Sequence, residues 1–216
     1  MVELKMKKFL ARVLISTAFV VCIFSLGAFA EDGKNYVMTI DGKDYDINID
    51  DTITVQSQKG NVAITLKRKE FSTFTKDVVS FEHRSDLSVA ATDIDRDIHQ
   101  YLLASALGTL IIVQKYDAMN PDSLNELMIN QIAKDDIASG YKIKKSDFSR
   151  TLSDGTKMNG LRARLTYKKD DVDLQVLSVD LGDSGVIAIT RYNNDMAVGE
   201  DKIIDRFWET LKLKKQ

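Results

Sequence analysis

Four oxygen-bearing side chains alternate along one acidic segment near the start of the chain. They are Asp44, Asp46, Asn48 and Asp50. Carboxylate and amide oxygens at alternating positions suit Ca²⁺, and an EF-hand loop begins in this way. That loop also needs glycine at its sixth position and glutamate at its twelfth, where this chain has Ile49 and Val55. Two interpretations stay open: the solvent-facing side of a β-strand, and a weak calcium site.

The tetrapeptide Gly182-Asp183-Ser184-Gly185 matches the sequence around the nucleophile of chymotrypsin-like proteases. A serine nucleophile needs a nearby histidine base and a third group that orients this histidine. His83 and His99 are the two histidines, and neither stands in the Ala-His-Cys setting of those proteases. A glycine-rich hairpin turn explains the same four residues. We therefore predict no catalytic residues and keep a hydrolase using Ser184 as the third of three functions.

The two histidines are the remaining candidates for a metal site. His83 follows Glu82 and His99 lies near Asp97, but neither histidine belongs to an HxxxH or HExxH pattern. We predict two unrelated surface histidines and no cofactor.

Basic residues gather between positions 142 and 164. They include Lys142, Lys144, Lys145, Arg150, Arg162 and Arg164. We single out Lys142, Lys144, Lys145, Arg162 and Arg164 as candidate partner-binding residues, for an acidic protein surface or anionic headgroups. The alternative is a self-neutralised face, because Asp171 and Asp173 follow on the next predicted strand and opposite charges on neighbouring strands attract.

Residues 141–192 read as an antiparallel meander of four strands. Asp154-Gly155 predicts a type I′ hairpin turn, in which both central residues need positive φ. Residues 161–167 alternate with period 2, which places Arg162 and Arg164 on the face opposite Ala163 and Leu165. Lys169-Asp170 predicts the next turn, and residues 182–185 predict the last one before a buried strand.

The chain before the meander predicts mostly short strands. Residues 36–40, 45–49, 52–55 and 62–66 predict a small antiparallel unit, and the polar residues 67–76 a connection. Strands are predicted at 78–81 and 87–90, around a turn at 84–86. Residues 98–107 fit a short helix or a strand, and we favour a hairpin with residues 109–116.

Two segments have helical patterns. Pro121 suits the first helical position and Gly140 the end, with an apolar stripe of Leu124, Leu127, Met128 and Ile132. Residues 200–211 predict a closing helix. Its expected buried side consists of Ile203, Ile204, Phe207, Trp208 and Leu211.

The first thirty residues have the pattern of a secretory signal peptide. A basic start precedes an apolar run, and Ala28-Phe29-Ala30 supplies small residues before a cleavage site after Ala30. An uncleaved anchor is the alternative, although the run is shorter than the ~20 residues that span a bilayer. Cleavage predicts a secreted or periplasmic protein without a stable membrane anchor. It also removes Cys22, so the mature chain draws no stability from disulfides.

Composition excludes one class of partner. The segment 1–30 takes four basic residues and one acidic residue from a chain of net charge −2, which leaves −5. A mildly acidic domain without a long basic run is poorly suited to nucleic acid. We predict no nucleic-acid partner.

The order of elements predicts an α+β fold, a mainly antiparallel sheet with packed helices. Residues 78–215 resemble the PsbP/DcrB-like family of extracytoplasmic proteins. The resemblance rests on Val79-Ser80-Phe81, the helix at 121–138, Gly160-Leu161-Arg162-Ala163 and the closing Phe207-Trp208-Glu209-Thr210-Leu211-Lys212-Leu213. It implies a PsbP-like α/β sandwich over 77–216, after an N-terminal β-hairpin unit and connection at 31–76, and a non-enzymatic binding or assembly role.

The leading functional hypothesis is therefore a non-enzymatic binding or accessory protein of the bacterial envelope, whose partner is a protein or another envelope component. The alternative is a small-ligand or calcium-binding module that uses the acidic strand or a cleft between sheet and helix.

Overall fold

The computed structural model describes residues 34, 36–57 and 60–214, and the chain divides into two compact units with the boundary between Lys67 and Arg68. The signal peptide predicted at 1–30 lies outside the described residues. No helix in the described part of the chain is long and apolar enough to cross a bilayer.

The described residues of the first unit form two antiparallel hairpins. Strand β1 (Tyr36–Ile40) pairs with β2 (Lys43–Ile47), and β3 (Thr52–Ser57) pairs with β4 (Gly60–Thr65). The β1–β2 turn at Asp41-Gly42 has positive φ at both residues, as a type I′ turn requires. The predicted antiparallel unit is thus present, but β2 ends at Ile47, so Ile49 and Asp50 lie in the following turn rather than on the strand.

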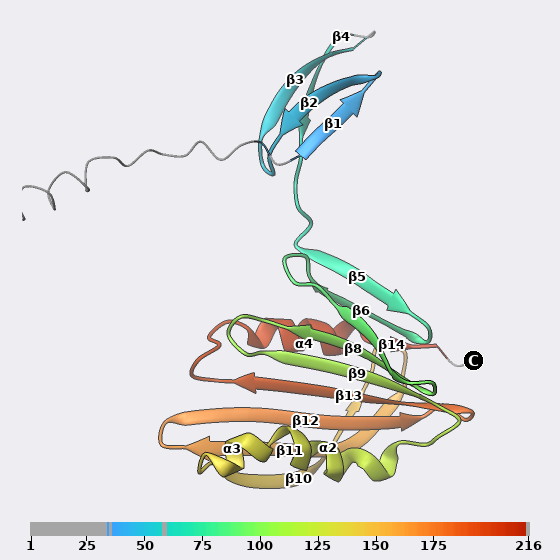
Figure 1. Cartoon of the computed structure of the whole chain (residues 1–216), viewed down its shortest axis with the longest axis vertical. Helices are drawn as coiled ribbons and strands as arrows, with labels where there is room; N and C mark the ends of the chain where they lie inside the picture. The colour runs from blue at the N-terminus through green and yellow to red at the C-terminus, as the bar shows by residue number, and fades with distance from the viewer. Residues whose placement is uncertain (1–33, 35, 58–59, 215–216) are drawn as a thin grey trace, which may run out of the picture. The chain divides into compact units, whose positions relative to one another are not determined.

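A seven-stranded antiparallel sheet forms the centre of the second unit, in the order β10-β11-β12-β13-β9-β8-β7. Its strands are β7 (Ala90–Asp95), β8 (Ile98–Ala104), β9 (Leu110–Asp117), β10 (Lys142–Thr151), β11 (Lys157–Tyr167), β12 (Asp170–Asp180) and β13 (Ser184–Asn193). The four-stranded meander is confirmed, as is the β8–β9 hairpin. The pairing of β9 with β13 makes the meander four strands of this seven-stranded sheet (Figure 1).

Short helices cover one face of this sheet. They are η1 (Asp122–Leu124), α2 (Asn125–Ile132) and α3 (Lys134–Ala138), and α2 contacts β11 and β12 (Figure 1). Buried Ile129 and Ala133 pack there with Ala163, Leu165 and other inward-facing residues of the sheet. The alternation predicted for residues 161–165 is confirmed.

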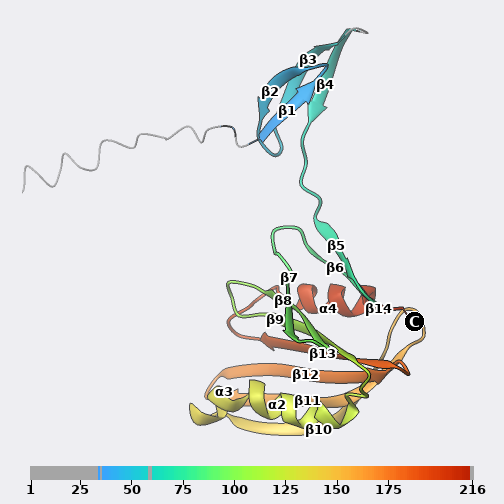
Figure 2. The ribbon, with the colours of Figure 1, turned by 45° about the vertical axis from the view of Figure 1, so that its right-hand side comes forward.

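The opposite face packs against helix α4 (Asp201–Thr210) and a three-stranded sheet of order β14-β6-β5. Its strands are β5 (Phe71–Lys76), β6 (Val79–Arg84) and β14 (Lys212–Leu213), and α4 lies beside β6 (Figure 2). All five side chains predicted for the buried side of the closing helix are buried: Ile203, Ile204, Phe207, Trp208 and Leu211.

Two predictions for the chain before the helices were wrong. The supposed connection at 67–76 contains strand β5, whose half-buried Phe71 and Phe74 belong to the pairing with β6. The strand predicted at 87–90 instead begins at Ala90 and pairs with β8, not with β6. The exposed side chains of β7 gave no apolar alternation from which its position could be read.

The helix predicted from Pro121 is interrupted. Pro121 precedes a 3₁₀ turn, and Ala133 separates α2 from α3, although Ala133 N–H still donates to Ile129 at 2.9 Å. Leu127 is 50% exposed, whereas the buried stripe is Asn125, Ile129 and Ala133. A 3₁₀ turn has three residues rather than 3.6, so it shifts the phase of the helix that follows.

The hairpin turn at Asp154-Gly155 is not of the predicted type I′. Gly155 has φ +85° while Asp154 has a negative φ, and Gly155 N–H donates to Leu152 at 2.9 Å. This is a three-residue loop closed by a glycine in the left-handed region, the second common hairpin geometry.

Candidate functional site

An open cleft of about 600 Å³ lies between α4 and the β10–β13 part of the sheet. We call it the α4 cleft. Its four basic side chains are Lys144, Arg150, Arg162 and Arg164, and its four acidic ones are Asp171, Asp173, Asp201 and Asp205. The candidate site is therefore strongly charged but has no net formal charge.

Strand register explains how these side chains meet. One row across the sheet reads Lys144, Arg164, Asp173 and Tyr192, and the next reads Ser146, Arg162, Gln175 and Thr190. Directly paired residues share a face, and period 2 keeps alternate residues of each strand on that face. The following rows carry apolar residues such as Met158, Leu177 and Ala188, which pack with α4. The cleft lies over the two polar rows of this face, next to the apolar rows on which α4 packs.

Two of the arginines are neutralised by the next strand. Arg162 Nε lies 2.6 Å from Asp173 Oδ1, and Arg164 Nε lies 2.8 Å from Asp171 Oδ1. The hydrogen bond from Arg164 holds the pKa of Asp171 below its usual value. Arg162 and Arg164 thus form the self-neutralised face that the sequence offered as one of two interpretations.

Arg150 has a different environment. Its Nε donates to Gln175 Oε1 at 3.1 Å, and its guanidinium lies 5.0 Å from the ring centroid of Trp208 and 5.4 Å from that of Phe148. No carboxylate among the described residues lies within ion-pair distance of it. Burial lowers the pKa of this guanidinium; the charge of Asp205 on α4 opposes this shift, and that of Arg162 adds to it.

A short hydrogen-bonded chain fixes this part of the cleft. Gln175, which is 4% exposed, accepts from Arg150 and donates from Nε2 to Asp173 Oδ2 at 2.8 Å. Asp173 also accepts from Arg162, whose guanidinium lies 5.6 Å from the Phe148 ring. Two guanidiniums therefore lie against one aromatic ring, and the carboxylate of Asp173 contacts Arg162 directly and Arg150 only through Gln175.

The α4 side of the cleft is acidic. Asp201 and Asp205 lie one helical turn apart, and neither has an ion-pair partner in the described part of the chain. Burial, reinforced by Asp201 and two other acids, raises the pKa of the Tyr192 hydroxyl beside them. Like charges four residues apart on a helix destabilise each other slightly, so this wall favours a cation.

The structure divides the five residues predicted to bind a partner. Lys144, Arg162 and Arg164 line the α4 cleft. Lys145 lies on the other face of the sheet, where its ammonium contacts Glu126 at 3.1 Å and Asn130 at 2.6 Å. Lys142 is exposed at the start of β10, one row beyond Lys144.

The four residues of the calcium hypothesis are spread over strand and turn. Asp44 and Asp46 are exposed on β2, while Asn48 and Asp50 follow it. Asp44 accepts from Thr39 at 2.6 Å, and Asp50 has φ +68° in the turn. Across the residues that the structure describes, no group of three or more His, Cys, Asp or Glu side chains is close enough to hold a metal ion.

The glycines around Ser184 have structural explanations. Gly182 has φ +99°, and a Cβ on Gly185 would lie 2.1 Å from Pro121 Cδ and 2.8 Å from Met119 O. Ser184 itself is 3% exposed, and it pairs with Asp117 of the neighbouring strand β9. The turn explains Gly182, and the close approach of Pro121 and Met119 explains Gly185.

His99 contacts Asp117, the strand partner of Ser184, but its ring nitrogens face two carboxylates. Nδ1 is 2.7 Å from Asp93 Oδ1 and Nε2 is 3.2 Å from Asp117 Oδ2. The hydrogen bond with Asp93 raises the pKa of the imidazole. Neither nitrogen is directed at the Ser184 hydroxyl, as a general base would be.

Sequence reasoning missed the α4 wall and Gln175. Asp201 and Asp205 were visible as an acidic pair at helical spacing, but nothing local indicates which strand faces a helix that is remote in sequence. Arg150 was noticed as one more cation of a basic run. Its contact with Trp208 distinguishes it from the other basic residues, and the sequence places Trp208 only on the buried side of the last helix.

No family model and no curated protein sequence matches this chain.

Proposed function

We propose that this chain is a non-enzymatic binding protein of an extracytoplasmic compartment, and that the α4 cleft is its binding site. One observation supports the choice of site: four charged side chains in the cleft have no ion-pair partner among the described residues. They are Lys144, Arg150, Asp201 and Asp205. Arg150 is half-buried, and an unpaired charge in that position is costly to a fold. Functional sites are where such costs are found.

The extracytoplasmic location rests on the signal-peptide pattern of residues 1–30. The α+β sandwich of the PsbP/DcrB-like family is part of the same proposal. Two layers of short helices, α2 with α3 and α4, lie against a mainly antiparallel sheet and are compatible with it. The role implied by that resemblance, binding without chemistry, agrees with a cleft that offers charges rather than a nucleophile and its base.

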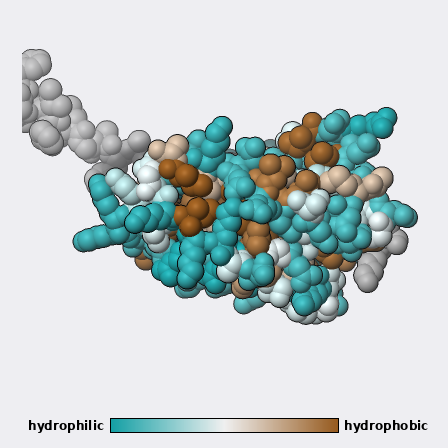
Figure 3. Space-filling view, turned by 90° about the horizontal axis from the view of Figure 1, so that it is seen from below, coloured by the Kyte–Doolittle hydropathy of each residue, from teal (hydrophilic) through white to brown (hydrophobic). Residues whose placement is uncertain are grey.

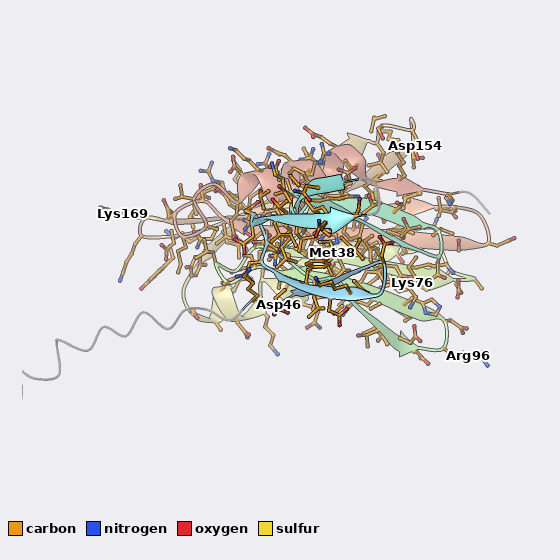
Figure 4. The ribbon with its side chains drawn as sticks, turned by 90° about the horizontal axis from the view of Figure 1, so that it is seen from above. Met38, Asp46, Lys76, Arg96, Asp154 and Lys169 are labelled. Carbon is orange, nitrogen blue, oxygen red and sulfur yellow. The ribbon has the colours of Figure 1, made fainter. Side chains whose placement is uncertain are left out.

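The occupant is either a small charged molecule or a charged segment of an envelope protein. A photo-crosslinking residue in place of exposed Ser146, on the cleft floor, distinguishes these in the native cell. Arg96, 89% exposed at the β7–β8 turn, is the matched control position, at the opposite edge of the sheet. Arg96, Asp154 and Lys169 lie at separate corners of this unit (Figure 4).

We expect an adduct at position 146 and none at position 96. The adduct's mass tells a small molecule from a protein, and Arg150→Gln should reduce its yield. Equal adducts at both positions, or none at either, would reject the cleft as the binding site. Recovery of a mature chain that begins at Glu31 in the extracytoplasmic fraction tests the location separately.

A further inference from the structure

The uncompensated charges of the α4 cleft lie on different elements. After Arg162 and Arg164 are matched with Asp173 and Asp171, the remaining cations belong to strand β10 and the remaining anions to helix α4. The cleft is thus polarised from the strand towards the helix, although its total charge is zero. A ligand with a single charge would meet one favourable wall and one unfavourable wall.

Arg150 has the features of an anion subsite. In the described structure its one hydrogen bond uses Nε, and an arginine has four further N–H donors on its two Nη atoms. Phe148 and Trp208 hold the guanidinium plane, so little side-chain freedom remains to be lost on binding. A planar fork of this kind matches a carboxylate or phosphate oxygen pair.

Asp201 and Asp205 provide the complementary subsite. Both are exposed on α4, both line the cleft, and their spacing of four residues puts them on one side of the helix. An ammonium group has three N–H donors and can bridge two carboxylates. It would also relieve the repulsion between them. The Tyr192 hydroxyl beside them supplies a neutral partner for the same group.

The rest of the molecule offers weaker sites. A second hollow near Phe71 and Ile203 mixes basic and acidic residues without an unpaired half-buried charge. Apolar patches on the side that is lowest in Figure 1 are broken up by hydrophilic residues (Figure 3). A smaller hollow, lined also by Trp208, shares Arg150 and Asp205 with the α4 cleft. The α4 cleft adds Asp201 and the larger volume, about 600 Å³ against about 400 Å³.

We infer that the α4 cleft binds a small zwitterion, with its anionic group at Arg150 and its primary ammonium at Asp201 and Asp205. The inference rests on the proposed function, because it assigns a ligand class to that binding site. A free peptide or amino acid has this chemistry with a carboxylate, and an ethanolamine phosphate headgroup has it with a phosphate.

Calorimetric titration of the purified chain with matched probes tests the inference. Triglycine carries both charges, N-acetyl-triglycine lacks the ammonium, and triglycine amide lacks the carboxylate. We expect triglycine to bind about tenfold more tightly than either blocked form, because each form loses a set of charge-assisted hydrogen bonds. Phosphoethanolamine identifies the source: tighter binding than triglycine indicates a phosphate headgroup, and weaker binding a carboxylate.

Variants assign the two ends. Arg150→Gln should make triglycine and its amide bind equally, and Asp201→Asn with Asp205→Asn should make triglycine and its acetylated form bind equally. Arg150→Lys keeps the charge without the fork and should retain part of the preference. Arg96→Gln is the control and should change nothing, and unchanged thermal unfolding checks that each variant folds.

Two outcomes would overturn the inference while leaving the proposed function standing. One is acetylated triglycine binding as tightly as triglycine, with both lost in Arg150→Gln, which indicates a site for anions alone. The other is no binding of triglycine or phosphoethanolamine in the millimolar range although the Ser146 position still gives an adduct in cells. Loss of that adduct as well would reject both proposals.

Discussion

Arg150 Nε donates a hydrogen bond to Gln175 Oε1 at 3.1 Å, across the intervening strand β11. This contact turns an arginine at the apolar end of its strand back over the Phe148 ring towards the polar rows of the sheet. It places a cation in the α4 cleft without giving it a carboxylate, so the charge remains available to a ligand. Gln175 thereby acts as a positioning residue.

Replacing this acceptor tests its role. We expect Gln175→Met to lower the free energy of unfolding by about 1 kcal/mol, because one side chain loses its bonds to Arg150 and Asp173. The Arg150 Nε–H signal in ¹⁵N spectra should also lose its protection from exchange with water. Gln131→Met, exposed on α2, should leave both unchanged. A protected Arg150 Nε–H in the Gln175 variant would show that the aromatic rings suffice to hold it.

The Arg164–Asp171 pair predicts an outcome for charge reversal. Arg164→Asp leaves two carboxylates on neighbouring strands and should destabilise the chain, but only slightly, because Arg164 is largely exposed and solvent screens its charge. Adding Asp171→Arg should restore most of the loss. Urea unfolding of the two single variants and the double variant measures the coupling. Additive effects in the double variant would mean that the two charges do not interact in solution.

His99 predicts a pH dependence of stability. Its imidazole has a raised pKa in the folded chain, chiefly because of the hydrogen bond with Asp93. The resulting stabilisation is fully present below the unfolded histidine pKa of about 6.5, and it is lost as pH rises through the higher folded value. His99→Gln should therefore cost most near pH 5, about 0.5 kcal/mol, and least near pH 9.

Unfolding curves at pH 5, 7 and 9 measure this difference. The half-buried His83 donates from Nδ1 to the backbone carbonyl of Arg84 and faces no carboxylate among its described contacts, so His83→Gln is the matched control. A cost of His99→Gln that grows with pH would contradict a raised imidazole pKa in the folded chain.

Gly160 predicts a large loss of stability on adding a single methyl group. A Cβ at this position would lie 2.1 Å from the carbonyl oxygen of Val176 on the paired strand β12. A backbone atom has little freedom to move, so Gly160→Ala should cost about 2–3 kcal/mol. Thr166→Ala, exposed on the same strand, should cost less than about 0.5 kcal/mol. Equal melting temperatures for the two variants would show that β11 and β12 separate easily at this point.

Much of the local structure followed from residue order alone. The alternation at 161–165 identified the buried face of β11, since period 2 is a property of an extended chain whatever its neighbours. The sequence likewise identified the buried side of α4, and it offered neutralisation of the basic face by Asp171 and Asp173 as one of two interpretations. Each of these signals lies within about a dozen residues, so each depends on a hairpin or a helix that the chain forms with itself.

The failures lie where local signals are weak. Strand β7 has only exposed side chains, so no alternation marked its position. The helix after Pro121 has the right residues, but its 3₁₀ start changed which of them are buried, and Leu127 faces solvent.

The candidate site itself was decided by tertiary structure. In the sequence, Arg150 belongs to a basic run with Lys144. In the folded chain it contacts Trp208 and Gln175, which lie 58 and 25 positions further along the chain, and these contacts give it an environment of its own. Helix α4 packs on the apolar rows of the sheet and leaves the polar rows uncovered. Asp201 and Asp205 therefore form one wall of a cleft. The sequence by itself determined the faces of individual strands and helices, because those depend on backbone periodicity. Only the folded chain decided which charges remain unpaired, because pairing depends on distances between elements that are remote in sequence.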